Sequence, residues 1–270
     1  MSTPSEQAAA GSSEVILRAV RGRACYLTIN RPASRNALDE AAKQELLAAV
    51  VDAGSDPDIW AVVLTGTGDR AFCAGRDLKE LNEQAAAGEG ITLPMGGTTR
   101  NLHEVVLEVP KPTVAVLNGS AVGGGCELAL ACDLRIMADD AVLALPEAKR
   151  GMGANTATVL LPRMVAPARA YEMLYLGEPI DAQRALEWGL VNAVVSRESL
   201  WQEAQELVGR IVANAPLSLR RYKEMVSKGA SLPVSQALRL NVGPNPYTSE
   251  DRVEGVRAYV EKRVPRWTGR

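Results

Sequence analysis

The chain has 270 residues, of which 47% are hydrophobic and 23% charged, and its formal net charge is −2. A nearly neutral chain gives no reason to expect nucleic acid as the main partner, and no apolar run approaches the roughly 18–20 residues that span a bilayer. The length is enough for a large core, either as one sizeable domain or as one domain with an appendage.

The first half of the chain is expected to alternate between strands and helices. Residues 1–13 are small and polar and lack an apolar signal region, so we expect a disordered tail there. The expected elements are then strands at 15–20 and 25–30 joined by a hairpin turn at 21–23, a helix at 39–53, a strand at 60–65, and a glycine-containing turn at 71–80 that leads into a helix. Residues 83–99 are rich in Gly, Ala and Thr, which favours a mobile loop near a ligand, with a solvated linker as the alternative.

The second half continues the alternation and then becomes helical. We expect a helix at 101–109, a strand at 113–118, a helix at 126–132, strands at 134–138 and 142–145, a helix at 181–189, a strand at 190–195, and helices at 199–213, 216–227, 233–240 and 249–261. Buried strands that alternate with helices indicate an α/β fold. We therefore divide the chain into an α/β core at 14–198 and a helical C-terminal region at 199–270.

Cysteine and histidine content narrows the possible chemistry. The four cysteines include no Cys-x-x-Cys pair and stand beside apolar residues, so we expect buried thiols in a cytoplasmic protein. The only histidine is His103, which excludes most histidine-based metal sites and Ser-His triads. Its position in a helical segment favours a surface or packing role. Chemistry in this chain is therefore expected to depend on carboxylates.

Two glycine turns and two isolated acids predict an active site. Gly123, Gly124 and Gly125 follow a strand and open an apolar helix, and the pattern fits neither a dinucleotide fingerprint nor a P-loop. Close helix–strand packing explains one such turn equally well. A second turn at 74–76 favours another interpretation, because two backbone N–H groups aimed at one oxygen make an oxyanion hole.

The isolated acids are Glu127 and Glu147. Glu127 begins the apolar helix, where a helix dipole favours its charge but apolar neighbours make ionisation costly. Glu147 follows Pro146 in an apolar setting, although a plain loop carboxylate is the commoner fate of a single Glu. The basic residues at 79, 149–150 and 262–263 are candidates to bind an anion, with a solvated face as the default for each.

At these positions the chain resembles the enoyl-CoA hydratase/isomerase (crotonase) superfamily, from about residue 15 to the C-terminus. The matching segments are Asn30-Arg-Pro-x-x-x-Asn36-Ala-Leu38, Phe72-Cys-Ala-Gly-Arg-Asp-Leu-Lys79, Asn118-Gly-x-Ala-x-Gly-Gly-Gly-Cys-Glu-Leu128, Pro146-Glu147 and Trp188-Gly-Leu-Val-Asn-x-Val-Val195. The segment 144–149 and the ending 249–270 look most like the carnitinyl-CoA dehydratase group, although other bacterial paralogues share that ending.

The resemblance implies a spiral of ββα units with a helical C-terminal trimerisation region, and a homotrimer or a dimer of trimers. It implies an acyl-CoA substrate, with no metal and no cofactor beyond the CoA that is part of the substrate. By match, Arg76 and Gly124 would supply the oxyanion-hole N–H groups, and Glu127 and Glu147 would be the catalytic acids. The predicted CoA-binding residues are Arg35, Asn36, Ala37, Ala74 and Lys79.

Retention of both acids favours a hydratase, since hydration of an enoyl thioester needs one carboxylate to take a proton and another to give one. A double-bond isomerase, which manages with one acid, is the alternative within enzymes. The turn at 151–158 departs from the Pro-Gly-Ala-Gly-Gly-like turn of many hydratases and is one residue shorter. That departure leaves a catalytically silent acyl-CoA-binding protein as a third hypothesis.

Overall fold

The computed structural model describes residues 14–88 and 98–270. The predicted tail at 1–13, and residues 89–97 of the predicted loop, lie outside the described residues. The strands are β1 (Ile16–Arg21), β2 (Ala24–Ile29), β3 (Ala61–Gly66), β4 (Ala71–Cys73), β5 (Thr113–Leu117), β6 (Ser120–Val122), β7 (Leu134–Ala138), β8 (Val142–Ala144), β9 (Ile180–Asp181) and β10 (Ala193–Val195).

Helices alternate with the strands in the first two thirds of the chain and predominate after β10. The α-helices are α2 (Glu40–Ser55), α3 (Leu78–Ala86), α4 (Leu102–Glu108), α5 (Gly124–Ala131), α6 (Asn155–Met164), α7 (Pro167–Leu176), α8 (Ala182–Glu187), α9 (Leu200–Val212), α10 (Pro216–Gly229), α11 (Val234–Ala237) and α12 (Glu250–Val260). Short 3-10 helices are η1 (Pro32–Ser34), η2 (Pro146–Arg150) and η3 (Pro246–Thr248). No helix within the described ranges combines the length and apolar character needed to cross a membrane.

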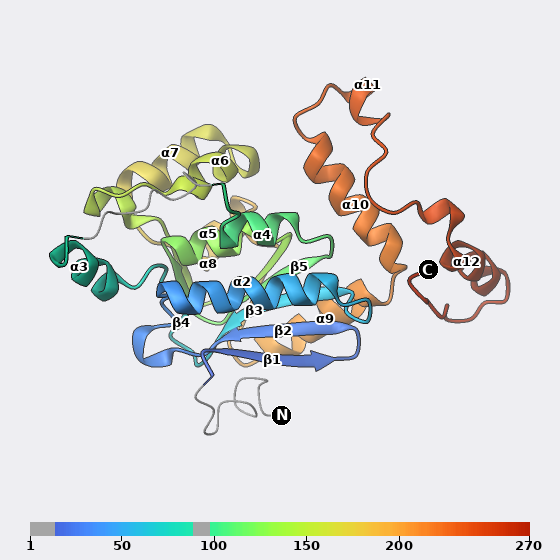
Figure 1. Ribbon diagram of the computed structural model, residues 1–270, viewed down its shortest axis with the longest axis horizontal. Helices are drawn as coiled ribbons and strands as arrows, with labels where there is room; N and C mark the ends of the chain where they lie inside the picture. The colour runs from blue at the N-terminus through green and yellow to red at the C-terminus, as the bar shows by residue number, and fades with distance from the viewer. Residues whose placement is uncertain (1–13, 89–97) are drawn as a thin grey trace.

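The strands form two sheets whose order reflects a repeating ββα unit. One sheet has six strands in the order β1-β2-β3-β5-β7-β10, and the other has four in the order β4-β6-β8-β9. Each successive pair, β3 with β4, β5 with β6 and β7 with β8, gives its first strand to the six-stranded sheet and its second to the other. Helices cover the sheets, and α2 crosses in front of β3 in Figure 1. The α/β prediction is confirmed.

The six-stranded sheet is parallel except at its first strand. The predicted hairpin pairs β1 with β2 antiparallel, with Ile16 opposite Ile29, whereas β2, β3, β5, β7 and β10 run parallel. Every residue of β2, β3 and β5 is buried. Parallel strands covered on both faces need continuous apolar sequence, which is the pattern seen at 60–65 and 113–118.

Two buried asparagines hold the corners between the sheets. The Asn118 side chain donates to the carbonyl of Gly68 at 2.7 Å and accepts from the N–H of Gly66 at 3.1 Å. The Asn36 side chain donates to the carbonyls of Thr67 and Ala71 at 3.0 and 2.7 Å. Because buried peptide groups at a turn need partners, these amides fix the turn after β3 against the strand that precedes the glycine triplet.

A buried arginine completes α5 at the end opposite to the glycines. Arg135 is 7% exposed and donates to the carbonyls of Ala129, Cys132 and Leu190. The first two belong to the last turn of α5 and its C-cap, where carbonyls have few partners within the helix, although the Ala129 carbonyl also accepts the N–H of Cys132. The guanidinium therefore caps the helix and ties it to the residues before β10.

Replacing Arg135 with Leu is expected to lower the free energy of unfolding by about 3 kcal/mol, because three carbonyls would each lose a buried, charged donor. Urea unfolding followed by circular dichroism measures this change. The exposed Arg210 on α9 is a matched control, and Arg210→Leu should change stability by less than about 0.5 kcal/mol. Equal stabilities of the two variants would contradict the capping role.

The C-terminal region divides into a packed helix and a projecting arm. α9 adds Leu200, Ala204 and Val208 to the buried core, whereas α10, α11 and α12 extend away from the layered body (Figure 1). Lys223 of α10 anchors the arm, since its ammonium lies 2.9 Å from an Asp133 carboxylate oxygen and 3.0 Å from the Lys111 carbonyl. We call α10–α12, residues 216–260, the C-terminal arm.

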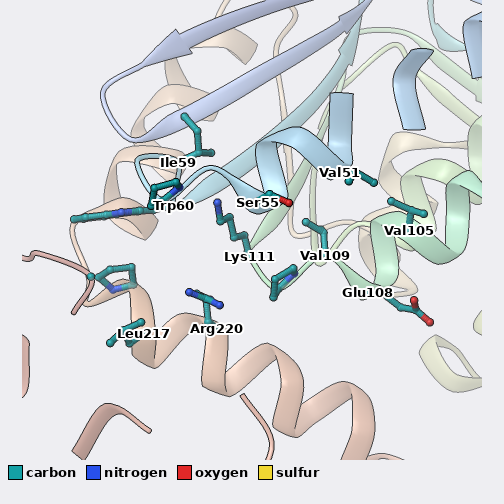
Figure 2. Close-up of a pocket in the computed structure, with 15 residues that line it drawn as sticks. Val51, Ser55, Ile59, Trp60, Val105, Glu108, Val109, Lys111, Leu217 and Arg220 are labelled. Atoms are coloured by element: carbon teal, nitrogen blue, oxygen red, sulfur yellow. The ribbon is translucent and has the colours of Figure 1, made fainter. Parts of the chain in front are cut away.

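A cavity of about 540 Å³ lies where the arm meets the body. Figure 2 shows its wall, which α2, α4 and α10 form with side chains such as Val51, Val109 and Arg220. Lys111 also lines it, and its ammonium donates to the carbonyls of Ala53 and Asp56 at the end of α2. Burial is the main cause that lowers the pKa of Lys111, to about 8. None of the predicted site residues lines this cavity.

Some predicted element boundaries were wrong. The helix α3 runs to Ala86, so the start of the loop predicted at 83–99 is helical. The helix predicted at 233–240 is only the short α11. Strands β4, β6 and β9, each of two or three residues, were not predicted as strands. Strands this short carry too few residues for a periodic pattern.

Candidate active site

The two glycine turns predicted from the sequence meet in the structure. A Cβ placed on Gly75 would lie 2.9 Å from the nitrogen of Gly124. A Cβ on Gly125 would lie only 2.1 Å from the carbonyl oxygen of Cys73. Real side chains do not tolerate such approaches to backbone atoms, so glycine is required where the turn after β4 touches the start of α5.

The N–H groups of Arg76 and Gly124 are available at this junction. Around them, the N–H of Leu38 donates to the Gly75 carbonyl at 2.8 Å, and the N–H of Asp77 donates to the Leu38 carbonyl at 3.0 Å. Within the described residues, neither Arg76 nor Gly124 donates its N–H to a backbone carbonyl. A Cβ on Gly124 would lie 3.9 Å from the Arg76 nitrogen, so both donors border one small space. This geometry fits the predicted oxyanion hole.

Glu127 lies in the first turn of α5, and its carboxylate faces the first turn of α6. The residue is 7% exposed, and its Oε1 accepts the N–H of Ala157 at 2.9 Å. The N–H of Thr156 also hydrogen-bonds to the carboxylate. Burial raises the pKa of Glu127, and these two amide donors oppose the rise. The start of a helix favours a negative charge, so α6 stabilises the ionised form.

Glu147 lies on η2, and its carboxyl reaches the glycine triplet from the other side. The residue is also 7% exposed, and a Cβ on Gly123 would lie 2.9 Å from its Oε1. Its Oε2 is buried and has no hydrogen-bond partner within the described residues. Burial raises the pKa of Glu147, and the charge of Glu127 acts in the same direction. A backbone hydrogen bond within the residue opposes this rise in pKa, whereas a buried carboxyl oxygen without a donor favours the neutral form.

Glu127 and Glu147 therefore both lie beside Gly123 but have different environments. The N–H of Glu127 donates to the Gly123 carbonyl at 3.0 Å, and the Glu147 carboxyl lies against the same glycine. One carboxyl has two backbone donors and the other has an oxygen with none. Pairs of titratable groups in contrasting environments are the arrangement that separates an acid from a base.

The predicted CoA-binding residues gather beside the oxyanion-hole turn. The N–H of Ala74 donates to the Arg35 carbonyl at 3.1 Å, which places the 35–37 segment against the turn. Arg35 and Lys79 are exposed, whereas Ala37 is buried. Asn36 is fully buried, its side chain is hydrogen-bonded to backbone groups, and its N–H donates to the Arg31 carbonyl, so in this structure Asn36 holds the turn together.

Sequence reasoning missed two features of the site. The α6 donors to Glu127 come from a turn that was noted only for its altered sequence. His103, expected on a surface or in packing, is partly buried, and its Nε2 lies 3.0 Å from the Gly124 carbonyl oxygen. The sequence signal for this contact was the position of His103 in α4, the helix that comes before the strands β5 and β6 and the glycine triplet.

Comparison with known proteins shows the family of the chain. The family model described as enoyl-CoA hydratase/isomerase matches residues 20–270. The carnitinyl-CoA dehydratase of Citrobacter koseri is 40% identical over 252 residues, which cover 90% of this chain and 94% of that protein. The carnitinyl-CoA dehydratase of Escherichia coli strain K12 is 39% identical over 257 residues, covering 92% and 96% of the two chains.

Solved structures give the same result. The enoyl-CoA hydratase of Bacillus anthracis superposes with a TM-score of 0.85 at 33% identity and covers 95% of this chain and all of its own. An enoyl-CoA hydratase of Mycobacterium tuberculosis H37Rv has a TM-score of 0.84 at 34% identity, with 95% and 99% of the chains covered. These matches confirm the resemblance stated from the motifs. The chain therefore belongs to the enoyl-CoA hydratase/isomerase family, in its carnitinyl-CoA dehydratase-like group, and is a hydratase/dehydratase-type carbon–oxygen lyase.

Proposed function

We propose that this enzyme adds water reversibly to the double bond of a 2-enoyl-CoA thioester. The observation that carries the proposal is the pairing of two buried glutamates in contrasting environments with two available backbone N–H groups. The thioester carbonyl accepts hydrogen bonds from Arg76 and Gly124, which stabilise the negative charge that develops on its oxygen during addition.

Glu127 is the general base and Glu147 the general acid in this proposal. Glu127, ionised and held by the two amides of α6, takes a proton from water, and the resulting hydroxide adds to Cβ of the substrate. Glu147, whose Oε2 has no donor, is neutral and gives its proton to Cα. The added hydrogen and hydroxyl together make one water, and a proton passed from Glu127 to Glu147 restores the starting state.

The CoA nucleotide is proposed to lie along the 35–37 segment, Ala74 and Lys79. Arg35 and Lys79 are exposed cations on neighbouring turns, which suits a phosphate group. Neither a metal nor a redox cofactor has a part in this chemistry, because two carboxyls and two amides supply every proton and charge that hydration requires.

A trimer or a dimer of trimers is the proposed assembly. The C-terminal arm exposes large apolar side chains, with Val226 at 72%, Leu238 at 75%, Tyr259 at 86% and Val260 at 73%. A monomer seldom leaves so much apolar surface on one projecting segment, and a second copy of the chain is the natural cover. Sedimentation equilibrium of the full chain would contradict this assembly if the monomer predominated at micromolar concentration.

The test of the proposed function follows absorbance of the conjugated enoyl thioester in a panel of 2-enoyl-CoA substrates. We expect loss of the conjugated absorbance and uptake of one oxygen from ¹⁸O-labelled water into the product. The panel includes carnitinyl-CoA in the dehydration direction, because carnitinyl-CoA dehydratases are among the relatives.

Two other results would overturn the proposal. Conversion of a 3-enoyl-CoA to its conjugated isomer without incorporation of ¹⁸O, and with no hydration, would show an isomerase. Tight acyl-CoA binding with no turnover of any substrate would show a silent binding protein.

A further inference from the structure

Nearly every hydrogen-bonding group around the first two glycines of the triplet has a partner. The N–H of Gly123 donates to the Ala144 carbonyl at 2.9 Å, and the Gly123 carbonyl accepts the N–H of Glu127 at 3.0 Å. The Gly124 carbonyl lies 3.0 Å from Nε2 of His103. The group left over is the N–H of Gly124, which is the proposed donor to the substrate.

Hydrogen bonds matter at these glycines because glycine is the residue with the greatest backbone freedom. Three successive residues without Cβ atoms also have no side chains that could pack and limit that freedom. The Gly124 N–H shares a peptide plane with the Gly123 carbonyl, which the N–H of Glu127 holds. The bond to the Gly124 carbonyl restrains the next peptide plane, so the backbone of Gly124 is held on both sides, and on one of them by a contact outside its own helix.

His103 comes from a helix that is itself firmly placed. Asn101 and Glu104 form a capping box at the start of α4, and Leu102 and Val106 are buried beneath it. At the other end, a Cβ on Gly54 of α2 would lie 2.6 Å from the Val109 side chain, so the two helices touch closely. Because α4 is held at both ends, the position of the His103 imidazole relative to the Gly124 carbonyl is well defined.

The chemistry of the contact fixes the tautomer. A carbonyl oxygen accepts and cannot donate, so His103 must carry a proton on Nε2. Burial lowers the pKa of His103, and the hydrogen bond to the Gly124 carbonyl opposes that change. The charged groups that act on the ring are Lys43 of α2 and Glu104 of α4, with opposite effects. The ring is therefore neutral near pH 7, with its proton on Nε2.

We propose that His103 is a positioning residue of the oxyanion hole, which holds the Gly124 carbonyl and so fixes the backbone of the residue whose N–H donates to the substrate carbonyl. This inference rests on the proposed function, since it assigns a role in the same site. His103 does not touch the reacting atoms. It acts through the peptide backbone, and its loss should affect the transition state more than substrate binding.

The first test uses the fact that His103 is the only histidine in the chain. Untagged protein labelled with ¹⁵N-histidine gives a single imidazole spin system, whose two nitrogen shifts report the tautomer directly. We expect the neutral Nε2–H form at pH 7. A neutral Nδ1–H ring would have no proton to donate to Gly124 and would overturn the proposal.

The second test compares three variants by KM and kcat. His103→Leu removes the donor and is expected to lower kcat by about tenfold to a hundredfold, below the ~10²–10³ for loss of an oxyanion donor itself, with KM changed less than about threefold. His103→Gln places an amide N–H at the reach of Nε2 and should recover most of that loss. Glu108→Gln alters an exposed residue of the same helix and should match wild type.

The third test separates this inference from the proposed function. Butyryl-CoA labelled with ¹³C at its thioester carbonyl has no double bond to hydrate, and an oxyanion hole lowers its C=O stretching frequency on binding. We expect the shift in wild type, a smaller shift in His103→Leu, and recovery in His103→Gln.

If wild type hydrates no substrate but still shifts the band through His103, the proposed function fails and this inference stands. If wild type is active and His103→Leu has the same kcat and the same band, this inference fails alone. Loss of kcat in His103→Leu without recovery in His103→Gln, at equal stability, also overturns it.

Discussion

Glu147→Gln is expected to lower kcat for hydration by about 10²–10⁴, the range for loss of a general acid, while KM changes less than about threefold. Gln has nearly the shape of the acid, so the pocket keeps its form, but an amide cannot give a proton to Cα. Steady-state kinetics with the best substrate of the panel measures both constants. Wild-type turnover in this variant would remove Glu147 from the mechanism.

A stability measurement on Glu147→Gln tests whether its loss of kcat is chemical or reflects a failure to fold. Burial raises the pKa of Glu147 above its ordinary 4.5, so the folded protein binds this proton more tightly than the unfolded chain. The resulting stabilisation is complete below pH 4.5 and is lost as pH rises through the raised pKa. Glu147→Gln lacks this dependence, and its melting temperature relative to wild type should therefore increase between pH 4.5 and 8.

Glu127→Gln is expected to lower kcat by a similar factor of about 10²–10⁴, because water loses its proton acceptor. Its structural effect should differ from that of the first variant. The carboxylate of Glu127 receives the N–H groups of Thr156 and Ala157, and Gln offers one acceptor oxygen in place of two. Burial still raises the pKa of Glu127, so removing the charge also stabilises this variant as pH rises, but the lost acceptor opposes that gain. We therefore expect the melting temperature of Glu127→Gln, relative to wild type, to increase less between pH 4.5 and 8 than that of Glu147→Gln, which thermal unfolding measures.

The double variant provides the control for both assignments. Residues that act as a unit in one step have non-additive effects, so Glu127→Gln with Glu147→Gln should be scarcely slower than the worse single variant. Binding of butyryl-CoA should persist in all three proteins, since the oxyanion-hole amides and the CoA segment are unchanged. A double loss equal to the product of the single losses would mean that the acids serve separate steps.

The meeting of the two glycine turns in the candidate site was predictable because its requirements are local. Three successive glycines before an apolar helix, and an acid in that helix, follow directly from the order of the residues. The second glycine turn carries the same kind of signal. Such patterns predict which backbone must be bare and which helix must be buried, and the structure places Gly75 and Gly124 in contact as that interpretation requires.

The long-range contacts were not predictable in the same way. The hydrogen bond from Ala157 to Glu127 and that from His103 to Gly124 depend on how whole helices are placed. Asn36 belongs to a family motif, which suggested that it contacts the ligand. In the structure its buried side-chain amide instead holds the turn after β3. A motif records that a residue is needed but does not separate a structural need from a chemical one.

The hydrogen bonds from α6 to Glu127 link the length of the loop before α6 to the proton affinity of this carboxylate. The turn at 151–154 leads directly into the amides that face this carboxylate, so adding or removing one residue there would displace those amides. A change of loop length made for any other purpose would then also alter the proton affinity of the base. Redesign near this site should therefore exchange side chains and leave the loop length alone.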